Sequence, residues 1–158
     1  MHEVNLETHS ERETMELGEW FGSHAVNDLF LALSGDLGAG KTHFVQGLAK
    51  GMGIDGVVGS PTFAIMNYYD EGRLPLKHFD FYRLQEAEEL YNIGWEEYST
   101  GGVTVAEWAD MFPDVLPKES IFIKIKNIGA DKREITISWD DTAPESVTKE
   151  ILRYASCH

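Results

Sequence analysis

The chain has 158 residues, 42% of them hydrophobic and 11% aromatic, so it can bury one core and is too short to suggest a second. It has no run of about 18 apolar residues, no signal-peptide pattern and a single cysteine, Cys157, so we expect a cytoplasmic protein without a membrane span or an intramolecular disulfide. Its net charge of −14 disfavours direct nucleic-acid binding, which Lys and Arg drive by neutralising phosphates.

The first predicted elements are a helix and a strand–loop–helix unit. Positions 10–23 should form the helix, because they open with a serine followed three residues later by a glutamate, as in a capping box. The continuously apolar run 29–33 is typical of a parallel strand that is buried on both faces. From Thr42 onward apolar residues recur at helical spacing, and Gly51 and Gly53 can end that helix.

The rest of the chain is predicted to be mainly strands. Alternating or β-branched runs, separated by turn residues, indicate strands at 63–69, 74–81, 103–106, 121–126 and 134–139. The first two should form a hairpin-like pair, and the last two an antiparallel hairpin with one wetter face. Helices are expected at 86–91, where Gly94 follows as a breaker, and at 144–154.

The most informative motif is the run Gly-Asp-Leu-Gly-Ala-Gly-Lys-Thr at 35–42, which matches the P-loop pattern G-x-x-x-x-G-K-[ST]. Strand, glycine-rich turn and helix follow in the order that directs backbone N–H groups and the helix dipole at an anion. Lys41 should reach the β- and γ-phosphates, and the Thr42 hydroxyl should ligate Mg²⁺. We therefore predict a nucleotide-binding α/β protein: one P-loop NTPase domain over 1–158, with a mixed, mainly parallel central sheet and antiparallel additions.

Hydrolysis would need a carboxylate for the hydrated metal and a group that orients the attacking water. Glu107 ends the strand at 103–106, and Asp80 follows a weaker strand that Lys77 and His78 interrupt. Ligands of open α/β sheets bind at the carboxyl ends of strands, so both acids are candidates. Each could equally be an exposed acid at a strand end.

Four further residues have competing interpretations. His78 is expected to be a packed or hydrogen-bonded strand residue rather than a ligand. Thr62 could contact the γ-phosphate or the metal as a switch threonine does, although Ser-Pro-Thr is also a common turn. Trp108 is expected in the core, and Arg83 in a salt bridge with an acid more than on a phosphate.

Four segments together resemble the signature set of the bacterial TsaE (YjeE) family: 35–42, Ser60-Pro-Thr-Phe63, His78-Phe-Asp-Phe-Tyr-Arg83 and Glu107-Trp108. That family consists of small ATPases needed to make threonylcarbamoyladenosine in tRNA. The likeness extends to Glu13-Thr14 near the start and Arg133-Glu134 near the end, whereas the tail after about position 140 carries no motif.

The resemblance implies a P-loop ATPase that uses ATP and Mg²⁺ and associates with the TsaB–TsaD pair. That pair modifies the adenosine beside the anticodon, so a partner would hold the tRNA and the isolated chain would not bind it tightly. The resemblance also gives catalytic roles to Lys41, Asp80 and Glu107. It assigns Mg²⁺ to Thr42 with Asp80 or Glu107, and the adenine side to residues 10–14. The residues expected to bind the nucleotide are Glu11, Thr14, Asp36, Leu37, Gly38, Ala39, Gly40, Lys41, Thr42, His43, Thr62 and Arg133.

Two other functions compete with this one. A small-molecule or nucleotide kinase also uses a P-loop, but it usually needs several charge-neutralising arginines, and the chain's five do not form an arginine-rich lid segment. A GTP switch would resemble G domains in carrying an Asn-Lys-x-Asp run, which this sequence lacks.

Overall fold

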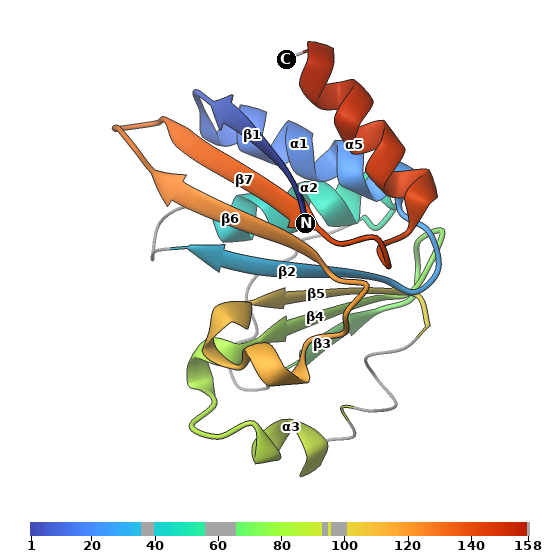
Figure 1. The fold of residues 1–158 in the computed structure, drawn as a ribbon. Helices are drawn as coiled ribbons and strands as arrows, with labels where there is room; N and C mark the ends of the chain where they lie inside the picture. The colour runs from blue at the N-terminus through green and yellow to red at the C-terminus, as the bar shows by residue number, and fades with distance from the viewer. Residues whose placement is uncertain (36–39, 56–65, 93–94, 96–100, 158) are drawn as a thin grey trace.

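The computed structural model describes residues 1–35, 40–55, 66–92, 95 and 101–157, and the described strands form one seven-stranded sheet (Figure 1). In chain order the strands are β1 (His2–Thr8), β2 (Leu29–Gly35), β3 (Met66–Tyr69), β4 (Leu76–Asp80), β5 (Val103–Glu107), β6 (Ile121–Asn127) and β7 (Arg133–Trp139). The helices are α1 (Glu11–His24), α2 (Lys41–Gly51), α3 (Glu88–Asn92) and α5 (Glu145–Cys157), with short 3₁₀ turns η1 (Phe81–Arg83), η2 (Ala109–Met111) and η3 (Pro113–Val115).

The sheet has a parallel centre and antiparallel margins. Its order is β1-β7-β6-β2-β5-β4-β3, in which β6, β2, β5 and β4 run parallel to one another. Strand β3 pairs antiparallel with β4, β7 with β6, and β1 with β7. The predicted fold class, α/β with a parallel centre and antiparallel additions, is confirmed. The parallel centre also places the carboxyl ends of β2, β4 and β5 at one edge of the sheet.

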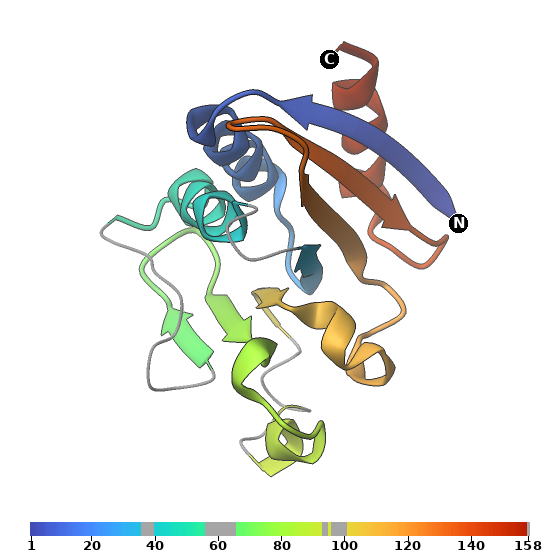
Figure 2. The ribbon, with the colours of Figure 1, turned by 90° about the vertical axis from the view of Figure 1, so that its left-hand side faces the viewer.

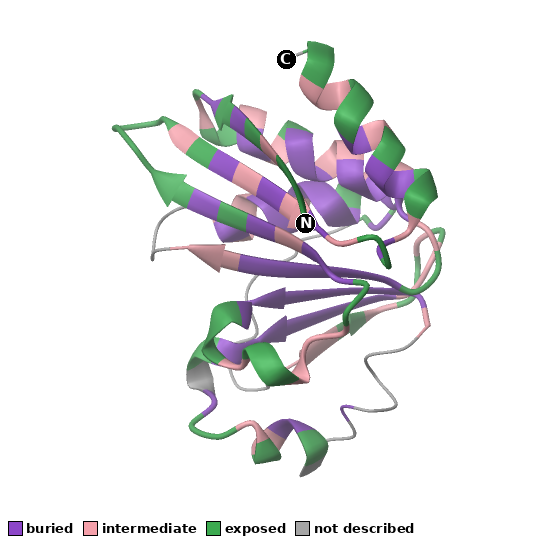
Figure 3. Ribbon diagram, in the orientation of Figure 1, coloured by how far each residue is buried: buried purple, intermediate pink, exposed green. Residues whose placement is uncertain are grey.

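Helices cover the two faces of the sheet unequally. Helices α1, α2 and α5 lie on one face, whereas α3 and the 3₁₀ turns lie on the other (Figures 1 and 2). Phe21 of α1, Phe44 of α2 and Ile151 of α5 belong to the larger core cluster. Phe79 and Trp95 belong to the smaller cluster on the opposite face. The central strands are therefore buried on both sides, while β6 alternates between buried and more exposed residues (Figure 3).

Helices α1 and α2 pack with their backbones in contact. A Cβ added at Gly47 of α2 would lie 1.9 Å from the carbonyl oxygen of Met15 in α1. A Cβ at Gly18 of α1 would lie 2.1 Å from the carbonyl oxygen of Phe44 in α2. Only glycine permits this approach. The two helices are thus fixed relative to each other, and so are the residues at their N-termini.

Most predicted elements are confirmed, with bounds shifted by a few residues. Helix α1 follows Ser10, whose Oγ accepts a hydrogen bond from the Glu13 N–H at 3.1 Å, as the capping box predicts. The Glu13 carboxylate reaches back to the N–H of His9 rather than to that of Ser10. The expected breaker Gly94 and the start of the strand predicted at 63–69 lie outside the described residues.

Strand β1 was not predicted from the sequence. Its residues alternate between the two faces, but only Leu6 and Thr8 are buried and Val4 is half-buried. It is an edge strand with polar residues at every second position, so its apolar signal is weak. Pairing with β7 fixes it, with Val4 opposite Ile137 and Leu6 opposite Ile135. No helix in the described part of the chain is long and apolar enough to cross a membrane.

Candidate functional site

The candidate site lies at the carboxyl edge of the parallel strands, where the motif segment and both predicted acids meet. Strand β2 ends at Gly35 and α2 begins at Lys41, so the glycine-rich segment starts and returns at this edge. Asp80 is the last residue of β4 and Glu107 the last of β5, and the strand register places the two opposite each other. This is the edge at which ligands of open α/β sheets bind.

Some of the predicted residues cannot be placed. Asp36, Leu37, Gly38 and Ala39 of the motif, and Thr62, lie outside the described residues, so their expected contacts with a nucleotide stay predictions. Gly40 is described and has φ of +104°, a left-handed conformation that favours glycine.

Lys41 is held at the edge of the sheet although it is charged. Its side chain is buried, Nζ donates a hydrogen bond to the carbonyl oxygen of Gly35 at 2.7 Å, and Nζ lies 4.1 Å from the ring centroid of Trp108. A cation over an indole face is attracted by the ring electrons. The ammonium group is therefore oriented by the last residue of β2 and by the residue that follows β5.

Trp108 is positioned by an unusual backbone conformation. It has φ of +59°, which is uncommon for any residue other than glycine and costs on the order of 1–3 kcal/mol. Its ring is half-buried and lies 4.9 Å from the ring of Tyr82. We predicted Trp108 as a core residue; it packs against the smaller core cluster but also contacts Lys41.

The two acids are almost completely buried, which excludes the alternative of exposed acids at strand ends. Glu107 is 3% exposed and Asp80 is 8% exposed. Buried carboxylates need hydrogen-bond partners. Asp80 Oδ1 accepts the N–H of Tyr82 at 3.0 Å and caps η1, and His78 Nε2 lies 2.5 Å from Glu107 Oε2. The expectation that His78 is a hydrogen-bonded strand residue is confirmed.

The arrangement suits Mg²⁺ in the type of its donors. Thr42 lies in the first turn of α2, directly after Lys41, and Asp80 and Glu107 supply two carboxylates. Among the residues that the structure describes, no cluster of three or more His, Cys, Asp or Glu side chains could hold a metal by itself. Mg²⁺ typically keeps several waters and binds one or two carboxylates together with substrate phosphates, so two acids and a hydroxyl are compatible with it.

A pocket opens beside the start of α1 and α2. It is lined by Ser10, Glu11, Thr14, Gly40, His43, Asp131 and Arg133. Five of the residues predicted to bind the nucleotide line it, namely Glu11, Thr14, Gly40, His43 and Arg133, whereas Arg12 and Glu13 of the predicted 10–14 region do not. Asp131 was missed, because its place in the turn between β6 and β7 gives only a turn signal. His43 Nε2 lies 3.5 Å from the Glu11 carboxylate, so α1 and α2 are also linked across the pocket.

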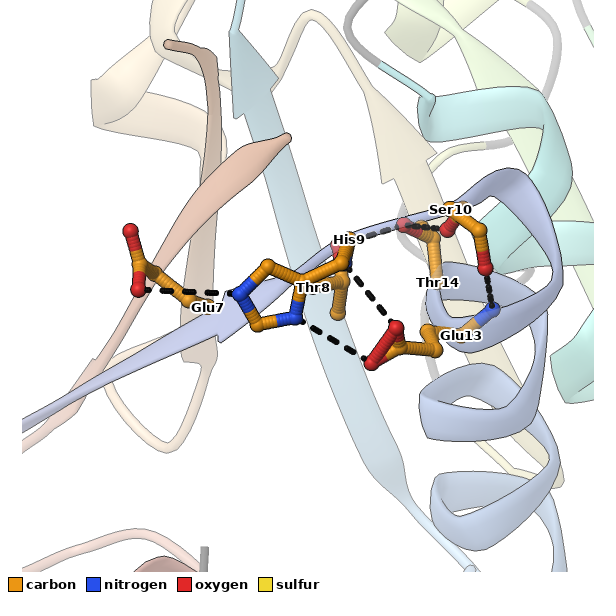
Figure 4. A network of polar contacts seen from close by, with 6 residues as sticks. All are labelled: Glu7, Thr8, His9, Ser10, Glu13 and Thr14. Atoms are coloured by element: carbon orange, nitrogen blue, oxygen red, sulfur yellow. Dashed lines mark hydrogen bonds and ion pairs between the residues drawn. The ribbon is translucent and has the colours of Figure 1, made fainter. Parts of the chain in front are cut away.

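Polar contacts at the β1–α1 junction fix one wall of this pocket (Figure 4). The hydroxyls of Thr8 and Thr14 are 2.8 Å apart and buried, and the Thr14 N–H donates to the carbonyl oxygen of Ser10. His9 lies between two carboxylates, 3.9 Å from Glu7 and 3.4 Å from Glu13. Because its hydroxyl is engaged by Thr8, Thr14 presents its methyl group toward Gly40.

The sheet, the P-loop motif between β2 and α2, and the paired acids define an α/β protein with the sequence features of nucleotide-binding proteins. The model of the family described as Threonylcarbamoyl adenosine biosynthesis protein TsaE matches residues 8–135. The chain belongs to the TsaE family.

Named relatives and a solved structure agree with this assignment. The chain is 39% identical over 155 residues to the tRNA threonylcarbamoyladenosine biosynthesis protein TsaE of Bacillus subtilis, covering 98% of this chain and 97% of that one. It is 38% identical to the protein of the same name from Treponema pallidum, over 82% and 96% of the two chains. The crystal structure of Bacillus subtilis YdiB superposes with a TM-score of 0.80 at 35% identity, covering 97% of this chain and 96% of the other.

Proposed function

We propose that this chain is an ATPase that binds Mg²⁺ and ATP at the carboxyl edge of the sheet. It would act in the cytoplasm with the TsaB–TsaD pair to support threonylcarbamoylation of the adenosine next to the tRNA anticodon. The relatives' names support the tRNA role. The observation that carries the ATPase proposal is the pairing of Asp80 with Glu107 at the strand ends beside the motif lysine.

In this proposal each residue has one role in handling the phosphates. Lys41 exchanges its contact with the Gly35 carbonyl for the β- and γ-phosphates, because a phosphate oxygen is a stronger partner for an ammonium group. Thr42 and Asp80 would hold the metal, and a bound metal would neutralise the charge that develops on the transferred phosphoryl group. Glu107 orients the attacking water and takes its proton.

The net charge supports a model in which a partner protein, rather than this chain, binds the tRNA. At −14 the chain should repel the tRNA backbone, so the TsaB–TsaD pair would hold the tRNA and this chain would supply the nucleotide-dependent step.

Phosphate release from ATP without any acceptor tests the ATPase proposal directly. We expect the wild type to release phosphate slowly and Lys41→Ala to release none above background. Lys50→Ala is the matched control, because Lys50 lies on the same helix in an exposed ion pair with Glu19. Phosphate transfer only when an acceptor is added would instead indicate the kinase alternative.

Association with the partner is tested by co-elution. We expect the chain to co-elute with purified TsaB–TsaD, and to do so differently in ATP and in ADP. If the chain elutes alone in both nucleotides, the partner assignment is wrong even if ATP hydrolysis is observed.

A further inference from the structure

His78 is a buried polar side chain for which the proposed reaction has no role. It lies in the middle of β4, is 0% exposed, and has Nε2 2.5 Å from Oε2 of Glu107 on the neighbouring strand. The simplest reading of this contact is structural: each buried group gives the other a hydrogen-bond partner. The position of His78 in the sheet indicates a further role.

The strand register places His78 behind the site rather than in it. Side chains alternate along a strand, so His78 and Asp80 share one face of β4, and Val105 and Glu107 share the same face of β5. Asp80 lies opposite Glu107, and His78 lies opposite Val105. His78 therefore lies two residues further from the carboxyl edge than Asp80, and its side chain reaches Glu107 diagonally across the two strands.

The two ring nitrogens of His78 indicate which group donates the hydrogen bond to the other. Among the described residues, His78 Nδ1 is buried and has no hydrogen-bond partner. A proton on Nδ1 would leave a buried donor unpaired, which is more costly than an unpaired lone pair. We therefore place the ring proton on Nε2, so that His78 donates and the Glu107 carboxylate accepts.

We propose that His78 is a positioning residue for Glu107. Its Nε2–H holds Oε2, so that the carboxylate keeps one orientation and Oε1 remains for the attacking water at the carboxyl edge. This inference rests on the proposed role of Glu107, because His78 acts only through that residue.

Kinetics of three variants test the proposal. His78→Phe removes the donor at similar bulk, and we expect it to lower the turnover number on the order of 10–100-fold, the range typical of residues that orient a functional group, with little change in ATP affinity. His78→Gln keeps an N–H donor on a flexible chain and should recover part of the turnover. Thr104→Val is the control, because Thr104 is buried in β5 and faces the other side of the sheet.

A double-mutant cycle separates positioning from general disruption of the strand. In a Glu107→Ala background, adding His78→Phe should cause no further loss of turnover, since its effect passes through Glu107. An equal fold loss in both backgrounds, or a folded His78→Phe with wild-type turnover, would overturn the positioning role while leaving the proposed function in place. Wild-type turnover in Glu107→Ala alone would overturn the role of Glu107 and, with it, this inference.

Imidazole nitrogen NMR of the protein without nucleotide gives a readout that does not depend on turnover. We expect His78 to show the Nε2–H tautomer, with a ring proton resonance that changes in Glu107→Ala and not in Thr104→Val. A proton on Nδ1 would contradict the assignment. This measurement remains informative if His78→Phe fails to fold.

Discussion

The contact between α1 and α2 leads to a quantitative prediction for Gly47→Ala. The added methyl group would meet the Met15 carbonyl oxygen at 1.9 Å, and a backbone atom cannot avoid it by changing rotamer. Overpacking typically costs about 1–3 kcal/mol, and this rigid contact belongs near the upper end. Alanine regains up to ~1 kcal/mol in helix propensity over glycine. The net loss should be about 2 kcal/mol of unfolding free energy, or roughly 4–8 °C in Tm for a chain of this size.

Urea and thermal denaturation measure this loss, with Gly129→Ala as the matched control. A Cβ at Gly129 would be 3.5 Å from its nearest neighbour, the Lys132 side chain, which is ordinary van der Waals contact. The control should therefore be neutral or more stable by up to about 1 kcal/mol. Because α1 and α2 both contribute residues to the pocket, Gly47→Ala should also weaken nucleotide binding. A Gly47→Ala protein as stable as the wild type would refute the reasoning from close backbone contact.

Three further predictions concern the acids, the buried lysine and tRNA. Asp80→Ala and Glu107→Ala should lower turnover far more than nucleotide affinity, since other groups still hold the phosphates; unchanged turnover in both would remove them from the mechanism. Burial lowers the pKa of Lys77 below its ordinary 10.5, and the negative charge of Asp28 raises it by less. The native state therefore releases this proton at a lower pH than the unfolded chain. Stability should therefore rise as pH approaches 10.5, and urea titrations at several alkaline pH values should show a smaller rise in Lys77→Met; parallel profiles would contradict this. Filter binding of tRNA to the isolated chain should be weak at physiological salt, and tight, salt-sensitive binding would overturn the accessory role.

Local patterns were enough to predict the elements that carry the motif. The apolar run 29–33 is buried along its whole length, and Ser10 caps α1 as its spacing indicates. Strand β1 could not be predicted from the sequence, because it is stabilised by pairing with β7, which is distant in sequence, rather than by an apolar run of its own. Edge strands of this kind depend on cross-strand neighbours that a local pattern does not contain.

The candidate acids could be predicted from their positions at strand ends, but their surroundings could not. That Asp80 lies opposite Glu107, and that His78 reaches Glu107, follows from the register of β4 on β5. The contact of Trp108 with Lys41 depends on a left-handed backbone at position 108, which no propensity of tryptophan indicates.

Ligand-induced stabilisation shows whether Lys41 and the start of α2 form a site for Mg-ATP. At a hundredfold excess of ATP over its dissociation constant, the wild type should gain about 2.7 kcal/mol of stability. That gain corresponds to a Tm increase of roughly 5–11 °C. Lys50→Ala should show the same increase, and Lys41→Ala, measured against its own nucleotide-free Tm, should show almost none. An equal increase in Lys41→Ala would show that Lys41 does not hold the nucleotide.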